Sequence, residues 1–469
     1  MIPPKPVTFA LYFGNRGFFP ETLIAAARTE LADAVARAGY GSLMLEVGAT
    51  RYGAVETVAE GAVYADFLAR NRGRFDGVIL CLPNFGDETG AVSALRDAGV
   101  PIWVMAYPDE RDKMGFTERR DAFCGKFSIM DVFCQYRLPF SAFTPHVIHP
   151  ASGAFQTQVH TFAAVCRVVG GMRRMTVGAV GARTTAFKTV RFDELALQRY
   201  GITTEALDLS EVIRRVRSVN PAGAAFRDKI ERLRGYTRWD GVPAEACETL
   251  ARLGVVLDEL IAEYQMDALA LRCWIELEQE LRISPCVLLS EINDRGIPAA
   301  CELDVCNAVA MRALRLASGR PATCLDWNNN YGDDPDKCIL FHCGPVPQSL
   351  MTAKGQVIDH PMFAKALGAG CGFGCNVGRI APAPLTYASA KTEDGRLVFY
   401  LGEGAFTADP IADEFFGCAG VAQISDLQRK LLAIGRQGYR HHVSVTTGHT
   451  AEAVREAFER YLGYTLTEL

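Results

Sequence analysis

The sequence predicts an α/β protein with two Rossmann-like parallel-sheet domains followed by a β-rich C-terminal domain, formed by an antiparallel sheet or small barrel. Two observations support this. Fully apolar strand-like runs alternate with amphipathic helical segments through the first two thirds of the chain. The pattern then changes to short alternating strands separated by turn residues. A chain of 469 residues exceeds one ordinary domain, and we place the domains at 1–152, 153–318 and 319–469.

The first domain is predicted from alternating strand and helix signals. Its strand-like runs are almost free of polar residues, which is typical of a parallel sheet covered on both faces. Such sheets carry their functional loops at the carboxyl ends of the strands. Strands are expected at 7–13, 41–47, 76–83 and 101–107, and helices at 20–38, 58–71 and 88–99.

The second domain follows a Pro-rich segment, 137–153, which we interpret as a linker. A helix over 154–172 leads to a strand with Gly178 and Gly181, but these glycines do not complete a GxGxxG motif, so a plain turn is favoured over a nucleotide-dependent oxidoreductase. A helix-then-strand pattern at 248–274 follows. Another helix is expected from near Asp304 to Gly319.

The third domain is predicted from three strand-like stretches, 338–344, 383–404 and 441–448. Glu393-Asp394-Gly395 divides the second stretch into two strands, as expected for a hairpin turn. A helix over 450–463 closes the chain.

Composition narrows the possible partners. Hydrophobic residues make up 49% of the chain, charged residues 22%, and the net charge is -5 with both signs mixed. We therefore expect no nucleic-acid partner and no anionic membrane partner. No apolar run reaches the roughly eighteen residues of a membrane span, and the N-terminus does not resemble a signal peptide. The fifteen cysteines lie mostly in apolar runs, which favours reduced thiols and a cytoplasmic location.

Two acids follow buried-looking strands, Glu302 after "IPAAC" and Asp326 after "PATCL". His342 ends the strand "CILFH", and His441 and His442 open "HHVSVTTGH". Carboxylates with one or two imidazoles suit a divalent ion such as Mn²⁺. The alternative is structural: Glu302 caps the following helix, Asp326 makes a turn with the solvated asparagines 328–330, and the histidines are ordinary strand ends.

The segments 265–344 and 440–449 resemble the L-fucose isomerase family and, more distantly, L-arabinose isomerase. In fucose isomerases a Glu is followed by an Asp at the separation seen here, then by a His in a segment like "FHCG", and finally by a distant C-terminal His ahead of a short strand and Gly-His. The resemblance implies that Glu302, Asp326 and His442 bind Mn²⁺ in a divergent member of this family.

The resemblance also implies further site residues. His342 matches a ligand of the arabinose branch, so it is either a fourth ligand or a neighbour of the ligands. Gln265 and Arg16 match residues that contact substrate, Arg16 through a neighbouring subunit. His441 stands where fucose isomerases have an Asn beside the sugar, which favours a substrate other than fucose. The family builds homo-oligomers, trimers and hexamers.

Trp274 is the remaining candidate. Its ring could form the floor of a sugar pocket, or it could belong to the hydrophobic core. The leading hypothesis is an enzyme, an aldose–ketose isomerase that converts a free hexose, deoxyhexose, pentose or 6-substituted sugar through a cis-enediol. Glu302 and Asp326 would be its base and acid. The alternative is a non-catalytic sugar-binding or regulatory protein on the same scaffold.

Overall fold

The computed structural model describes residues 6–469. These residues form two compact units. One comprises residues 6–170 together with Glu452–Gly463, and the other comprises Gly171–Ala451 with Tyr464–Leu469. No helix in the described part of the chain is long and apolar enough to cross a membrane, and all fifteen cysteines, which lie within it, are free thiols.

The N-terminal unit is built on a four-stranded parallel sheet, as predicted, in the order β2-β1-β3-β4. Every residue of β3 and of β4 is buried, because helices cover the sheet. The strands are β1 (Thr8–Phe13), β2 (Gly41–Met44), β3 (Gly77–Leu82) and β4 (Ile102–Ala106). The helices are α1 (Thr22–Arg37), α2 (Val58–Arg70), α3 (Glu88–Leu95), α4 (Ala122–Gln135), α5 (Gly153–Met172) and α15 (Ala451–Glu456).

The larger unit contains a second four-stranded parallel sheet, in the order β6-β5-β7-β8. Its strands are β5 (Met175–Val180), β6 (Ile202–Leu207), β7 (Ala268–Leu271) and β8 (Ala299–Ala300). Its helices are α6 (Glu194–Arg199), α7 (Leu209–Ser218), α8 (Ala224–Tyr236), α9 (Ala244–Glu263), α10 (Glu276–Glu280), α11 (Cys286–Asp294) and α12 (Val305–Ser318). Gly319 ends α12 in a left-handed conformation, where the sequence placed the stop.

The C-terminal part of the larger unit is a nine-stranded, mostly antiparallel sheet. Strands β15-β10-β9-β16-β13-β14 form a closed ring, because β14 also pairs with β15. The strands are β9 (Ala322–Asn330), β10 (Lys337–His342), β11 (Gln356–Asp359), β12 (Phe373–Arg379), β13 (Ala383–Glu393), β14 (Arg396–Phe406), β15 (Cys418–Gln423), β16 (His442–Thr447) and β17 (Thr465–Thr467). Two helices, α13 (Pro361–Leu367) and α14 (Leu427–Arg436), accompany it.

The barrel confirms the predicted β-rich domain and corrects one detail. Glu393 pairs with Arg396 across the tight turn between β13 and β14, as expected for a hairpin. Asn328, Asn329 and Asn330 were expected in a turn, but they belong to β9, which continues past Asp326 because it pairs with β10 over this length. Asp326 therefore lies within a strand rather than at its end.

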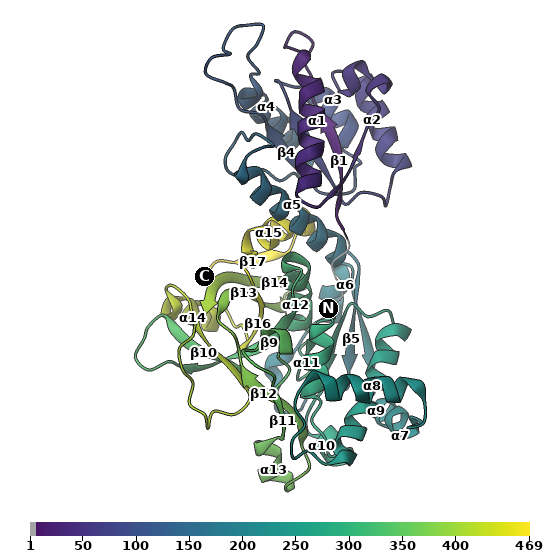
Figure 1. Cartoon of the computed structure of the whole chain (residues 1–469), viewed down its shortest axis with the longest axis vertical. Helices are drawn as coiled ribbons and strands as arrows, with labels where there is room; N and C mark the ends of the chain where they lie inside the picture. Colours follow the sequence, from purple (N-terminus) through teal and green to yellow (C-terminus); the bar gives the residue numbers. More distant parts are fainter. Residues whose placement is uncertain (1–5) are drawn as a thin grey trace. The chain divides into compact units, whose positions relative to one another are not determined.

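Helix α12 connects the second parallel sheet to the barrel. It packs against β5 and β7 on one side and against β9, β13 and β16 on the other. Nearly all of its residues are buried, since both faces are covered. Figure 1 shows α12 between β5 and the barrel strands β13 and β16. The turn that carries Glu302 joins β8 to α12 in the sequence.

Candidate metal centre and active site

Strand register places the first two candidate residues side by side. Asp326 on β9 and His442 on β16 are directly paired. The neighbouring pair, Leu325 and Val443, belongs to the apolar core of the barrel. Because side chains alternate along a strand, Asp326 and His442 project from the outer wall of the barrel, toward α12. His342 ends β10, the strand on the other side of β9.

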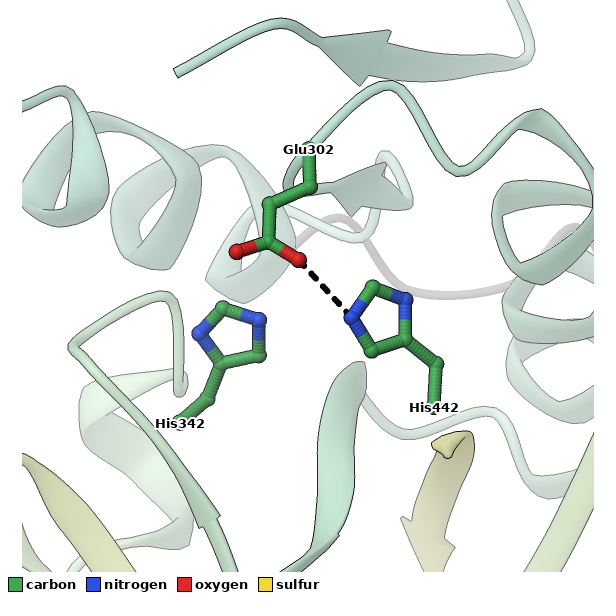
Figure 2. Close-up of side chains that lie close together, drawn as sticks. All are labelled: Glu302, His342 and His442. Carbon is green, nitrogen blue, oxygen red and sulfur yellow. Dashed lines mark hydrogen bonds and ion pairs between the residues drawn. The ribbon is translucent and has the colours of Figure 1, made fainter. Parts of the chain in front are cut away.

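Glu302 reaches this wall from the turn that precedes α12. Its carboxylate Oε2 lies 2.9 Å from His442 Nε2. Figure 2 shows the side chains of Glu302, His342 and His442 pointing toward a common point, from three segments far apart in the sequence. Glu302 and Leu303 both have left-handed backbones, with φ of 60° and 62°. Two consecutive non-glycine residues in this region are uncommon, and such conformations concentrate at functional sites.

The polar atoms of this cluster suit a divalent cation. Ligand atoms of Glu302, His342 and His442 lie within 4.8 Å of one another, and so do those of Asp326, His441 and His442. Asp326 Oδ1 is 3.5 Å from His442 Nε2. Asp326 Oδ1 and His342 Nε2 are both buried without a hydrogen-bond partner among residues 6–469, which is costly unless another group satisfies them. The donor set of carboxylates and imidazoles matches a hard or borderline ion.

The charges within the cluster shift its pKa values in opposite directions. Burial acts to raise the pKa of Glu302, but the hydrogen bond and charge of His442 outweigh it and lower the pKa. Burial raises the pKa of Asp326, and the nearby histidines offset this only in part. Burial acts to lower the pKa of His442, yet the neighbouring Cys324, Asp304 and Glu302 raise it well above its usual range. Burial and His442 lower the pKa of His441. The two acids thus have different environments.

The sequence reasoning did not assign a site role to Asp304 or Arg440. Asp304, not Glu302, caps α12, since its Oδ1 accepts from Asn307 N at 3.0 Å. Asp304 Oδ2 also lies 2.8 Å from His442 Nδ1, and Oδ1 pairs with the guanidinium of Arg440. The two closely spaced acids in "CELD", Glu302 and Asp304, were a signal in the sequence that both could belong to the site. Their spacing alone does not reveal which nitrogen of a histidine each acid contacts.

Two aromatic side chains, Trp274 and Phe187, lie against this cluster. Trp274 follows β7, and its Nε1 donates to Glu302 Oε1 at 3.0 Å, so it orients that carboxylate. Phe187, which the sequence did not single out, lies on the loop after β5 with its ring centroid 5.7, 5.4 and 5.8 Å from those of Trp274, His441 and His442. The loop following β5 therefore packs against the cluster.

The two predicted substrate contacts, Gln265 and Arg16, belong to different units. Gln265 precedes β7 and is exposed. It lies at the amino end of that strand, whereas Glu302 and Trp274 follow the carboxyl ends of β8 and β7. Arg16 belongs to the N-terminal unit, where it pairs with Glu88 and its guanidinium lies 4.4 Å from the Phe85 ring centroid. Within the larger unit the structure thus brings together Glu302, Asp326, His342, His441, His442 and Trp274, and not Gln265.

Comparison with known proteins agrees with this geometry. The fucose/sulfoquinovose isomerase N-terminal domain matches residues 10–173, and the L-fucose isomerase C-terminal domain matches residues 340–469. The chain is 23% identical over 410 residues to the sulfoquinovose isomerase of Priestia aryabhattai, covering 86% of this chain and 87% of that protein. It is 25% identical over 304 residues to the sulfoquinovose isomerase of Clostridium sp. (strain MSTE9), covering 64% and 66%.

The fold, the carboxylate–imidazole cluster and these matches define an enzyme of the sugar isomerase class, which interconverts an aldose and a ketose. The two domain matches together span well over half of the chain and lie in the order expected from the resemblance. The chain belongs to the L-fucose isomerase family, as a divergent member.

Proposed function

We propose that the protein is a metal-dependent aldose–ketose isomerase, with Mn²⁺ as its working ion, that acts through a cis-enediol. The observation that carries the proposal is the convergence of Glu302, Asp326, His342 and His442. Two atoms of this cluster that could bind a metal ion, Asp326 Oδ1 and His342 Nε2, are buried and have no hydrogen-bond partner among residues 6–469. Glu302, Asp326 and His442 would hold the ion. His342, whose Nε2 is one of the unpartnered atoms, is the fourth candidate ligand.

The two carboxylates would divide the proton transfers. One takes the proton from C2 of the aldose while the carbonyl oxygen O1 gains a proton, which yields the enediol. The proton on O2 is then removed and C1 is protonated, which yields the ketose. Each general acid or base contributes about 10²–10⁴-fold to the rate. When bound, the ion supplies Lewis-acid stabilisation of the negative charge that develops on O1 and O2, an effect of several kcal/mol.

We propose further that the substrate is an aldose with an anionic 6-substituent, such as sulfoquinovose. The curated relatives named above are sulfoquinovose isomerases. Arg183 and Lys188 lie in the segment after β5 that also carries Phe187, which packs on the cluster, and neither makes an ion pair with any residue of 6–469. Arg183 Nη1 donates only to the carbonyls of Thr184 and Thr185. Unpaired cations beside an active site are suited to recognise an anionic group.

The direct test is turnover. Sulfoquinovose, L-fucose, L-arabinose and unsubstituted D-glucose are each incubated with the protein after EDTA treatment, and again after addition of Mn²⁺, Co²⁺ or Mg²⁺. We expect ketose from the anionic aldose, abolished by EDTA and restored best by Mn²⁺. Glu302→Gln should lose this activity and still bind sugar. Sugar binding without ketose formation under any metal condition would favour the non-catalytic alternative.

The homo-oligomeric state implied by the family, a trimer or hexamer, remains part of the proposal. Light scattering coupled to size-exclusion chromatography measures it directly. A monomeric mass for an active protein would contradict it.

A further inference from the structure

The carboxylate of Asp304 is fully buried and accepts from four donors. Its Oδ1 accepts from Arg440, in a short contact, and from Asn307 N at 3.0 Å. Its Oδ2 accepts from Asn307 Nδ2 at 2.7 Å and lies 2.8 Å from His442 Nδ1. Asp304 and His442 are 0% exposed. Because an ionised carboxylate can only accept, His442 Nδ1 must carry the hydrogen of this contact.

The cap on α12 does not by itself explain this arrangement. A serine, threonine or asparagine caps a helix about as well as an aspartate does, without burying a charge. Burying an ion pair such as Asp304–Arg440 is expensive and is often no better for stability than apolar packing. Beyond the cap, and besides its contacts to Arg440 and the Asn307 side chain, Asp304 makes a contact to His442.

The same turn holds both nitrogens of His442. Glu302 lies next to Nε2 at 2.9 Å, and Asp304, two residues later, lies next to Nδ1. The left-handed conformations of Glu302 and Leu303, which are unfavourable for residues other than glycine, allow both carboxylates to reach one imidazole. The unfavourable backbone of Glu302 and Leu303 thus serves to hold two carboxylates against the imidazole of His442.

We infer that Asp304, held in place by Arg440, is a positioning residue that fixes the ring and tautomer of His442, with hydrogen on Nδ1 and the Nε2 lone pair directed at the ion. The inference rests on the proposed function, since it assumes that Nε2 is a metal ligand. Carboxylates that accept from the far nitrogen of a ligating histidine typically change metal affinity by about 10–100-fold when they are altered.

The surroundings make Asp304→Asn a selective perturbation. Asparagine keeps the shape and the capping ability of the residue. An amide NH₂ at the Oδ1 position would face the Arg440 guanidinium and a backbone N–H, neither of which accepts a hydrogen bond. The Oδ2 position faces His442 Nδ1 and the side-chain amide of Asn307. Both can accept, His442 by losing its Nδ1 hydrogen and Asn307 by turning its amide oxygen toward residue 304, so the NH₂ takes this position and donates to His442 Nδ1. That places the histidine hydrogen on Nε2, where it blocks the lone pair needed for the ion.

Manganese affinity of the full-length protein is the readout. Free Mn²⁺ has a sharp EPR signal that is lost on binding, so titration gives dissociation constants for wild type, Asp304→Asn and a control, Asp208→Asn. Asp208 caps α7 through one contact, to Ser210 N at 2.7 Å, and does not touch a histidine. We expect affinity to fall by about tenfold or more in Asp304→Asn and to stay at the wild-type value in the control.

A second measurement does not depend on the variant folding. In wild-type protein labelled with ¹⁵N-histidine and loaded with diamagnetic Mg²⁺, the ¹⁵N shifts of His442, assigned by their loss in His442→Gln, should show a protonated Nδ1 and an unprotonated Nε2. A protonated Nε2 would overturn the inference, as would unchanged Mn²⁺ affinity in a folded Asp304→Asn protein. Failure of the wild type itself to bind any Mn²⁺ would instead refute the proposed function, and the inference with it.

Discussion

Glu278, at the start of α10, gives a pH-dependent stability that can be worked out from its surroundings. The side chain is 0% exposed. Its Oε1 accepts from Ser284 Oγ at 2.9 Å, while Oε2 is buried without a hydrogen-bond partner in the part of the chain that the structure describes. Burial raises the pKa of Glu278 from 4.5 to about 8, and the hydrogen bond and the charge of His360 offset only part of this effect. The folded protein therefore holds this proton at a pH where the unfolded chain has released it.

The sign and size of the effect follow from this difference. Because the pKa is higher in the folded state, the contribution of Glu278 is fully present below about pH 4.5 and is lost as the pH rises to about 8. Each pKa unit corresponds to about 1.4 kcal/mol. Between about pH 5.5 and about pH 7.5, the unfolding free energy of wild type should thus fall by about 3 kcal/mol relative to a variant that cannot titrate there.

Glu278→Gln is that variant, since glutamine matches the protonated acid in shape. We expect its free energy of unfolding, measured in urea on metal-free protein by tryptophan fluorescence, to rise against wild type by about 1.4 kcal/mol per pH unit across this window. Three of the four tryptophans, Trp239, Trp274 and Trp327, report on the unit that contains Glu278. Glu280→Gln, at a half-exposed carboxylate, is the control. A difference between Glu278→Gln and wild type that does not change with pH would refute the reasoning.

Three further predictions concern the centre itself. Trp274→Phe keeps a ring but removes the donor to Glu302, so kcat/KM should fall by about tenfold or more; an unchanged value would exclude an orienting role. Asp326→Asn, assayed at saturating Mn²⁺, should lower kcat by about 10²–10⁴-fold with sugar binding retained by calorimetry; full activity would remove it from the proton transfers. Arg183→Gln combined with Lys188→Gln should lower kcat/KM about 10–100-fold for sulfoquinovose and leave an uncharged aldose unaffected; equal losses for both sugars would contradict anion recognition.

Most of the fold could be predicted because apolar strands between amphipathic helices leave few alternatives to a parallel sheet covered on both faces. The sequence left open whether the C-terminal strands form an antiparallel sheet or a small barrel, since closure depends on the pairing of Ala405 and Phe406 with Gln423 and Ala422 across a long connection. The extent of β9 was also missed. Asn328–Asn330 have a turn-like composition, but pairing with β10 outweighs this preference.

The carboxyl ends of the strands in the second parallel sheet explain which site residues could be predicted from the sequence. Functional loops follow the carboxyl ends of parallel strands, and Phe187, Trp274 and Glu302 follow β5, β7 and β8 respectively. The rule that favours Trp274 and Glu302 also argues against Gln265, which lies at the opposite end of β7. Applied strictly, it would have directed attention to the loop after β5 and so to Phe187.

Asp304 marks the limit of reasoning from spacing. Two acids separated by one residue lie on the same side of an extended strand and on different sides of a helix, so "CELD" is compatible with either arrangement. The outcome depends on two left-handed residues, neither of them glycine, which no local propensity favours. The role of Arg440 could not be predicted either, because an arginine next to two histidines in the sequence does not indicate a particular function. It acquires a role only when β16 brings it against the turn before α12. The chemistry of the centre therefore depends on a backbone conformation that long-range packing imposes, and not on the identity of the acids alone.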